Sequence, residues 1–233
     1  MSSKTPTLIS RAFTLLRRRP GYAWRAFRGY SLFVVSRWLR AAAGAPRGVT
    51  LGSNVRLQRN SALMAESPDA RISIGADSIV YEYAKIESFG RGKIEIGDAS
   101  ILGEVRIFSR YRIKIGKRFL ASWNVFIQDF EPHPVDPAER RRQVERMVAE
   151  FRPIFVSDPP PIERENGAAE FPGEEIVIGD DVWVGANTTI LKGARLGDGC
   201  IVATGAVVTR GDYAPGSVLA GSPARVVKNV LSK

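Results

Sequence analysis

The chain has 233 residues, of which 44% are hydrophobic and 25% are charged, a balance that excludes a disordered or low-complexity protein. Its one Cys excludes an internal disulfide and suits a reducing compartment, and its one His excludes any site built from two histidines of one chain. The net charge of +10 comes from residues 1–47, which hold ten Lys and Arg residues and no Asp or Glu, so the remaining sequence is electrically balanced.

Residues 1–47 are predicted to form a basic, aromatic helical segment. Large apolar residues recur there at helical spacing: Trp24, Phe27, Val34, Val35 and Trp38. The longest uncharged stretch, residues 29–36, is far shorter than the roughly 20 residues of a membrane-spanning helix, and the arginines after it argue against a secretory signal. Two interpretations stay open, a helical cap packed on the body of the protein and an interfacial helix pair on an anionic cytoplasmic membrane face. No base-reading motif accompanies the charge, so a nucleic-acid partner is not expected.

From residue 51 onward, an aliphatic residue followed by Gly recurs, and further aliphatic residues follow it at steps of about six. These pairs are Leu51-Gly52, Ile74-Gly75, Ile96-Gly97 and Ile115-Gly116. Short insertions at about 66–71, 87–93 and 104–112 are expected to offset this register without ending it. A six-residue period predicts one short strand and one tight turn per repeat, with three repeats in each triangular coil, and therefore an all-β solenoid.

The period is absent from residues 128–175, a stretch too long to be a passive connection. Asp136 is a predicted N-cap, Pro137 a predicted first helical residue and Glu139 their capping-box partner, so we expect a helix near 137–150. Four apolar residues at helical spacing predict that one face of this helix packs down: Val144, Met147, Val148 and Phe151.

The one histidine, His133, lies in this loop between Pro132 and Pro134. Proline fixes its own φ angle and restricts the residue before it, so the backbone around His133 has little freedom. An imidazole held in this way suits a proton acceptor near neutral pH, whereas an isolated His is more often an ordinary surface residue. Asp129 and Glu131 are the nearby carboxylates that could orient the ring, and the sequence does not distinguish between them.

The period returns in its strictest form after the loop. Aliphatic residues occupy every sixth position: Ile178, Val184, Ile190, Leu196, Val202 and Val208. Small or β-branched residues occupy the fifth position of each six: Val182, Thr188, Ala194, Cys200 and Ala206. Three repeats per coil would place Ile178 beside Leu196 and Val184 beside Val202. Cys200 is therefore expected in the core and not as a nucleophile.

Residues 176–230, from Ile-Val-Ile-Gly-Asp-Asp-Val-Trp-Val-Gly-Ala-Asn to Ala-Gly-Ser-Pro-Ala-Arg, resemble the hexapeptide-repeat acyltransferases. The phrase His-Pro-Val-Asp-Pro at 133–137 resembles their sugar O-acetyltransferase branch, which includes maltose and galactoside acetyltransferases. The resemblance implies a left-handed parallel β-helix over 48–230, with an inserted catalytic loop at 128–175, after the helical segment 1–47. It also implies a homotrimer with acetyl-CoA in the groove between neighbouring prisms, and no metal.

The same resemblance implies roles for individual residues. His133 would be the general base for the acceptor hydroxyl. The positions that would contact acetyl-CoA are Trp183, Gly185, Ala186, Thr204, Thr209, Arg210 and Arg225. The two arginines suit nucleotide phosphates, but they are equally compatible with solvated turn charges, and Trp183 could simply cover the edge of the prism.

The expected acceptor is a hydroxyl of a sugar or glycan, and residues 1–47 modify that expectation. Relatives that acetylate free disaccharides carry an N-terminal acidic residue, which is absent from 1–47. We therefore expect a bulkier or membrane-held glycan, as in surface polysaccharide assembly, and a cytoplasmic protein at or near the membrane. Two alternatives stay open: an N-acetyltransferase for an aminosugar or antibiotic, and a non-catalytic solenoid that binds glycan or protein. A zinc enzyme of the carbonic anhydrase type needs three histidines at its metal and is not expected.

Overall fold

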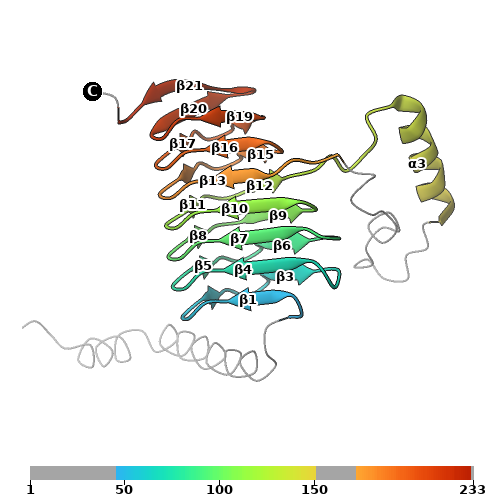
Figure 1. The fold of residues 1–233 in the computed structure, drawn as a ribbon, viewed down its shortest axis with the longest axis horizontal. Coiled ribbons are helices and arrows are strands. Elements are labelled where there is room, and N and C mark those ends of the chain that lie inside the picture. The colour runs from blue at the N-terminus through green and yellow to red at the C-terminus, as the bar shows by residue number, and fades with distance from the viewer. Residues whose placement is uncertain (1–45, 151–171, 232–233) are drawn as a thin grey trace, which may run out of the picture. The chain divides into compact units, whose positions relative to one another are not determined.

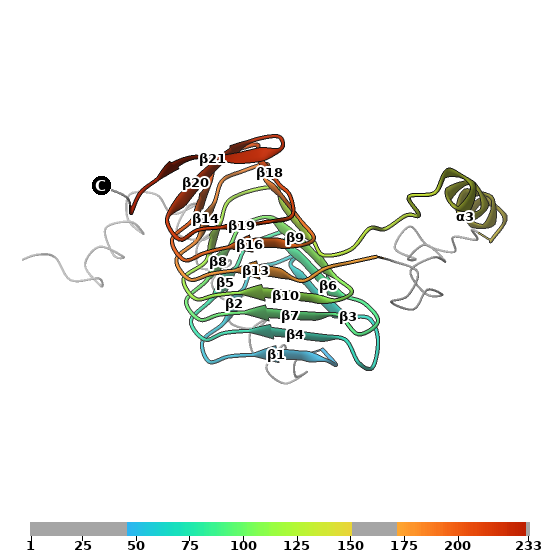
Figure 2. The ribbon, with the colours of Figure 1, turned by 45° about the horizontal axis from the view of Figure 1, so that its top comes forward.

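The computed structural model describes residues 46–150 and 172–231, which belong to one compact unit, Pro46–Lys233. This unit is a left-handed parallel β-helix, as the six-residue period predicts. Figures 1 and 2 show its coils stacked in chain order, with β1 at one end and β21 at the other. The helical segment predicted within 1–47 lies outside the described residues except for its last two positions.

Three sheets form the sides of the prism. Sheet A consists, in spatial order, of β1 (Val49–Leu51), β4 (Arg71–Ile74), β7 (Lys93–Ile96), β10 (Arg112–Ile115), β13 (Ile176–Ile178), β16 (Ala194–Leu196) and β19 (Gly211–Tyr213). Sheet B consists of β2 (Arg56–Leu57), β5 (Ile79–Val80), β8 (Ile101–Leu102), β11 (Leu120–Ala121), β14 (Trp183–Val184), β17 (Ile201–Val202), β20 (Ser217–Gly221) and β21 (Ala224–Asn229). Sheet C consists of β18 (Val207–Val208), β15 (Thr189–Leu191), β12 (Val125–Gln128), β9 (Val105–Ser109), β6 (Lys85–Ser88) and β3 (Ala62–Ala65). Strand β21 pairs antiparallel with β20 and so covers the edge of that strand in the last coil.

Each sheet contributes one column of inward aliphatic residues to the core. Strand pairing places Ile178 opposite Leu196 and Val184 opposite Val202, as predicted. These four side chains are at most 2% exposed. The residues at the fifth position of each repeat, including Cys200, are completely buried. Both parts of the repeat prediction are therefore confirmed.

One detail of the predicted register is wrong. The stretch 104–112 was expected to be an insertion, but Val105–Ser109 forms strand β9 in sheet C. Ile107 occupies the core column between Ile86 and Ile127, five residues after Leu102 instead of six. Burial of Ile107 keeps the core column continuous. The segment from Leu102 to Ile107 is therefore one residue shorter than a regular repeat, and the additional residues of this coil lie in the turn after β9.

Glycines form a column at the corner between sheets A and B, where the backbones of successive coils approach closely. Its members are Gly52, Gly75, Gly97, Gly116, Gly179 and Gly197. A Cβ atom on Gly97 would lie 2.6 Å from the carbonyl carbon and oxygen of Gly116. Backbone atoms cannot move aside as a flexible side chain can, so this spacing of the coils requires glycine.

Replacement of Gly97 by Ala is therefore expected to lower the free energy of unfolding by about 2 kcal/mol, as overpacking does elsewhere. Urea unfolding followed by circular dichroism measures the change. Gly205→Asn is the control, because Gly205 has a φ of +75° but open space around its Cβ position. Asn187, one coil earlier at the same corner, already adopts a φ of +57°, so Gly205→Asn should be close to neutral. Equal destabilisation by the two changes would contradict the steric explanation.

The loop helix is confirmed as α3 (Pro137–Glu150), and Asp136 caps it by accepting a 2.9 Å hydrogen bond from the Glu139 amide. The prediction that the apolar face of this helix packs against the protein is wrong for the single chain. Val144 and Val148 are 51% and 75% exposed, whereas Gln143 is only 3% exposed. The buried residue at this point of the helix is Gln143, whose side-chain oxygen lies 3.1 Å from Nδ1 of His133. Phe151 lies outside the described residues.

In the described part of the chain, no helix combines the length and apolar character required to cross a bilayer.

Candidate active site

The loop leaves the prism at the corner between sheets C and A, after β12, and returns just before β13 (Figure 1). We call this position the C–A corner. Its two ends are joined where the loop begins: the Glu131 amide donates to the Pro172 carbonyl at 3.0 Å, and the Glu174 amide donates to the Asp129 carbonyl at 2.9 Å. Phe130 and Gly173 also form an isolated antiparallel bridge. The loop therefore starts from a short two-stranded base on the prism.

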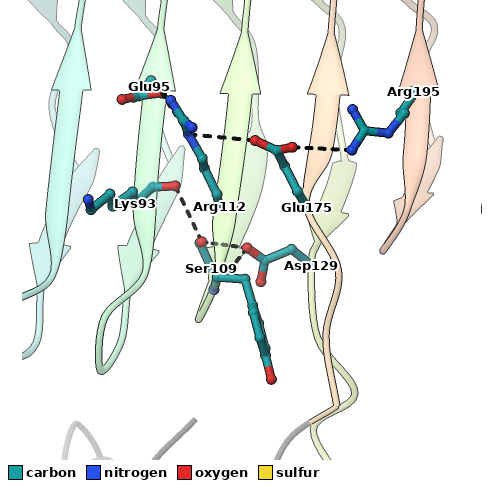
Figure 3. A network of polar contacts seen from close by, with 8 residues as sticks. Lys93, Glu95, Ser109, Arg112, Asp129, Glu175 and Arg195 are labelled. Carbon is teal, nitrogen blue, oxygen red and sulfur yellow. Dashed lines mark hydrogen bonds and ion pairs between the residues drawn. The ribbon is translucent and has the colours of Figure 1, made fainter.

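Asp129 anchors this base to the preceding coil. Its completely buried carboxylate accepts hydrogen bonds from the Ser109 hydroxyl at 2.6 Å, the Arg110 amide at 2.9 Å and the Tyr111 amide at 3.2 Å. Figure 3 shows Asp129 directed toward Ser109. Burial raises the pKa of Asp129 to about 6, against the opposing effect of these hydrogen bonds. The side chain fixes the start of the loop to the turn of the coil below it.

A row of ion pairs crosses the outer surface of sheet A beside this base (Figure 3). Arg112 lies 2.7 Å from Glu95 and 3.6 Å from Glu175, and Arg195 lies 3.3 Å from Glu175. The hydrogen bond and charge of Glu95 raise the pKa of Arg112 further above its ordinary value. Each exposed pair is weak by itself. Together they connect coils on both sides of the point where the loop interrupts the chain.

Two further ion pairs connect the loop base to the coils that follow it at the C–A corner. Glu131 lies 2.7 Å from the Nζ atom of Lys192, and Glu174 pairs with Arg210. Glu131 and Asp129, the two carboxylates predicted to orient His133, are thus engaged with the prism in the structure. Their role at the histidine stays a prediction without a contact in the described residues to support it.

An aromatic cluster lies under the loop base, and the sequence analysis did not identify it. The guanidinium group of Arg110 lies 5.3 Å from the ring centre of Phe89 and 5.2 Å from that of Phe130, which is a cation–π arrangement. Arg110 is only 5% exposed. Phe130 belongs to the loop and Phe89 to a coil well before it in the sequence, so the period of six could not reveal this contact.

The side chain of His133 is exposed, and its Nδ1 atom lies 3.1 Å from Oε1 of Gln143 on helix α3. The backbone next to it is also tied to the helix. Arg140 donates hydrogen bonds to the carbonyl groups of Pro134 and Val135 at 2.8 and 2.9 Å. The sequence analysis missed Gln143 because a buried glutamine has no periodic signature.

Three of the predicted donor-binding residues lie at another corner. Gly185, Ala186 and Thr204 occupy the corner between sheets B and C, which we call the B–C corner. A Cβ atom on Gly185 would lie 2.7 Å from the Thr204 amide, and the Gly205 amide donates to the Ala186 carbonyl at 2.9 Å. Gly185 is buried, Ala186 is partly exposed and Thr204 is exposed, so this corner combines small side chains with closely spaced backbone.

The remaining predicted residues are distributed over the prism. Trp183 is 48% exposed on the outside of sheet B, beside Leu120, which is 41% exposed. Thr209 and Arg210 lie at the C–A corner, where the Thr209 carbonyl accepts a hydrogen bond from Tyr213 and Arg210 pairs with Glu174. Arg225 is exposed on β21, and its Nη1 atom donates to the Ala224 carbonyl. One chain thus places His133 and the small-residue B–C corner at different corners of the same prism.

Within residues 46–150 and 172–231, no group of three or more His, Cys, Asp or Glu side chains is placed to hold a metal ion.

Residues 175–210 match the family model described as bacterial transferase hexapeptide (six repeats). We call residues 175–210 the hexapeptide region. It contains β13 to β18 and includes the strictest part of the predicted period. It also contains the B–C corner residues Gly185, Ala186 and Thr204.

Over 53 residues, the chain is 55% identical to 2,3,4,5-tetrahydropyridine-2,6-dicarboxylate N-acetyltransferase from Staphylococcus aureus (strain JH9). The match covers 23% of this chain and 22% of the relative, so the chain spans about a fifth of the length of the curated relatives it matches.

Two solved structures extend the comparison to most of the fold. AntD, an N-acyltransferase from Bacillus cereus in complex with dTDP and 3-hydroxybutyryl-CoA, has a TM-score of 0.55 at 15% identity, covering 78% of this chain and 84% of AntD. At this identity, the likeness shows a common fold. A maltose O-acetyltransferase from Clostridium difficile 630 covers 79% of this chain and 67% of its own at 21% identity, with a TM-score of only 0.43. The sugar O-acetyltransferase branch therefore stays a prediction.

Proposed function

We propose that this protein is an acyltransferase that moves an acetyl group from acetyl-CoA to a hydroxyl of a sugar or glycan, with His133 as the general base. The observation that carries the proposal is the position of the single histidine. His133 is exposed on a loop that interrupts a transferase hexapeptide fold, and that loop is anchored to the prism at its base.

The reaction requires one proton acceptor and no covalent enzyme intermediate. The acceptor hydroxyl gives its proton to Nε2 of His133 as its oxygen forms a bond to the thioester carbonyl carbon. When the carbon–sulfur bond breaks, the imidazolium returns the proton to the CoA thiolate. Cys200 takes no part, because its sulfur is buried and burial raises the pKa of its thiol.

The proposed active site lies between two copies in a trimer. Within one chain, His133 extends from the C–A corner, whereas the small residues that would admit the pantetheine arm lie at the B–C corner. A neighbouring copy can bring these two corners together. Exposed apolar side chains support this arrangement, since contact between copies would remove them from water: Ile101, Leu120 and Trp183 on sheet B, and Val144 and Val148 on α3.

An amine acceptor is the second candidate. The S. aureus relative is an N-acetyltransferase and AntD is an N-acyltransferase, so a specific finding favours nitrogen as the nucleophile. The same base would accept a proton from an amine. Release of free CoA, measured with matched hydroxyl and amino sugars in free, nucleotide-linked and lipid-linked forms, distinguishes the two reactions. Association of residues 1–47 with a membrane, and with it a lipid-linked acceptor, is part of this proposal.

Acetyl-CoA is expected to stabilise the protein. At a concentration 100 times its Kd, a ligand that binds only the folded state adds about 2.7 kcal/mol to the free energy of unfolding, so the thermal midpoint should rise by several degrees. Arg225→Ala should reduce this shift if Arg225 binds a phosphate group of CoA. Lys228→Ala is the matched control, because it removes another exposed cation from β21. A non-catalytic solenoid should show no shift at all.

A further inference from the structure

Gln143 is a buried amide in a place where a helix usually buries an apolar residue. It is 3% exposed, while Val144, the next residue along the helix, is 51% exposed. A buried polar side chain costs free energy unless it is hydrogen-bonded. The contact that compensates this cost is the one from Oε1 of Gln143 to Nδ1 of His133 at 3.1 Å.

The backbone around His133 is fixed from the same helix. Asp136 caps α3, and Arg140 binds the carbonyl groups of Pro134 and Val135. The backbone after the histidine and the histidine ring are therefore held by successive turns of one helix. This arrangement leaves the ring little freedom to rotate, while its side chain stays exposed.

We propose that Gln143 is a positioning residue for His133, which sets the tautomer of the ring and directs Nε2 outward as the proton acceptor. A neutral imidazole carries its proton on only one nitrogen, and the partner of the other nitrogen decides which one. The Gln143 oxygen accepts a hydrogen bond, so Nδ1 must carry the proton and Nε2 keeps its lone pair. Unlike the carboxylates predicted for this position, an amide does so without placing a negative charge beside the ring.

The tautomer can be measured directly, because the chain contains one histidine. The full-length protein, without a histidine tag, is labelled with ¹⁵N-histidine and examined by long-range ¹H–¹⁵N correlation spectroscopy between pH 5 and 9. We expect the Nδ1–H tautomer at high pH in the wild-type protein. The Nε2–H tautomer, or rapid exchange between the two, would overturn the proposal without any need for a variant.

Variants on α3 provide the second measurement. Gln143→Ala should shift the neutral ring toward a mixture of tautomers, whereas Glu145→Ala, which changes an exposed residue on the same helix, should not. Gln143→Glu should keep the Nδ1–H tautomer and move the titration of the ring to higher pH, because a carboxylate favours the imidazolium form. An unchanged spectrum in Gln143→Ala would refute the assignment, and circular dichroism checks that α3 remains folded.

The catalytic consequence rests on the proposed function. With an acceptor that is turned over, Gln143→Ala should lower kcat by roughly tenfold or more with a smaller change in KM, as loss of a group that orients a general base does. In Gln143→Glu the acidic limb of the kcat/KM profile should move to higher pH. If the tautomer results hold but no substrate is ever acetylated, the proposed function fails and the positioning of the ring stands. If acetylation occurs while the tautomer is wrong, only the role of Gln143 fails.

Discussion

Replacement of His133 by Ala is expected to lower acyl transfer by about 10²–10⁴-fold, the usual contribution of a general base. The side chain is exposed, so its removal leaves no cavity in the core of the prism, but it takes away the partner of the buried Gln143 amide and should lower the free energy of unfolding by about 1–3 kcal/mol. Release of free CoA measures the activity, and analytical ultracentrifugation checks that the variant assembles like the wild-type protein.

Cys200→Ala is the control for this experiment. Cys200 is fully buried, and its sulfur donates to the Ala214 carbonyl at 3.3 Å, so the substitution should lower stability slightly but leave turnover nearly unchanged. Near-normal transfer by His133→Ala would rule out the base mechanism. Loss of transfer in a folded Cys200→Ala protein would indicate an acyl-enzyme route.

Asp129 is expected to make the stability of the loop base depend on pH. Its pKa of about 6 in the folded protein lies above the ordinary value of 3.8, so the folded state binds this proton more tightly than the unfolded chain. The resulting stabilisation is complete below about pH 4 and is lost as the pH rises through 6. The difference in pKa corresponds to about 3 kcal/mol.

Asp129→Asn removes this titration. In this variant the new side-chain amide group faces the backbone N–H of Tyr111. That N–H then lacks its acceptor, at a cost of about 1–3 kcal/mol. The stability difference between wild type and Asp129→Asn should therefore be greatest near pH 4 and shrink by up to about 3 kcal/mol toward pH 7. Urea unfolding at a series of pH values tests this trend. Glu131→Gln, which removes a half-exposed carboxylate from the same base, should keep the wild-type dependence on pH. A difference that stays constant between pH 4 and 7 would show that Asp129 does not titrate in this range.

The expected results for His133→Ala and Asp129→Asn distinguish a loss of turnover from a loss of stability at the loop. His133 is exposed and contacts only helix α3 among the described hydrogen bonds, so its loss should affect turnover strongly and the stability of the prism little. Asp129 is buried and connected to Ser109 and to the backbone of the preceding coil, so its loss should affect folding first. A reduced activity in Asp129→Asn would then follow from displacement of the loop and would be accompanied by lower stability.

The amino-acid sequence by itself determined the prism and the helix in the loop. Burial of one aliphatic residue in every six is a local requirement that repeats in each coil, so the core columns could be predicted without tertiary information wherever the period is regular, but not at Ile107. The capping signal of Asp136 and Pro137 is local as well, and it placed the start of α3 correctly.

Only the tertiary structure decided which side chains meet around the loop. Asp129 contacts Ser109 and Arg110 because one coil stacks on the next, and Glu131 contacts Lys192 across the whole insertion. Helix α3 buries Gln143 and exposes Val144, and the Gln143 amide makes a hydrogen bond with His133. Such contacts join residues that are ten to sixty positions apart, and their partners depend on the stacking of coils and the path of the loop, which leave no periodic trace in the sequence.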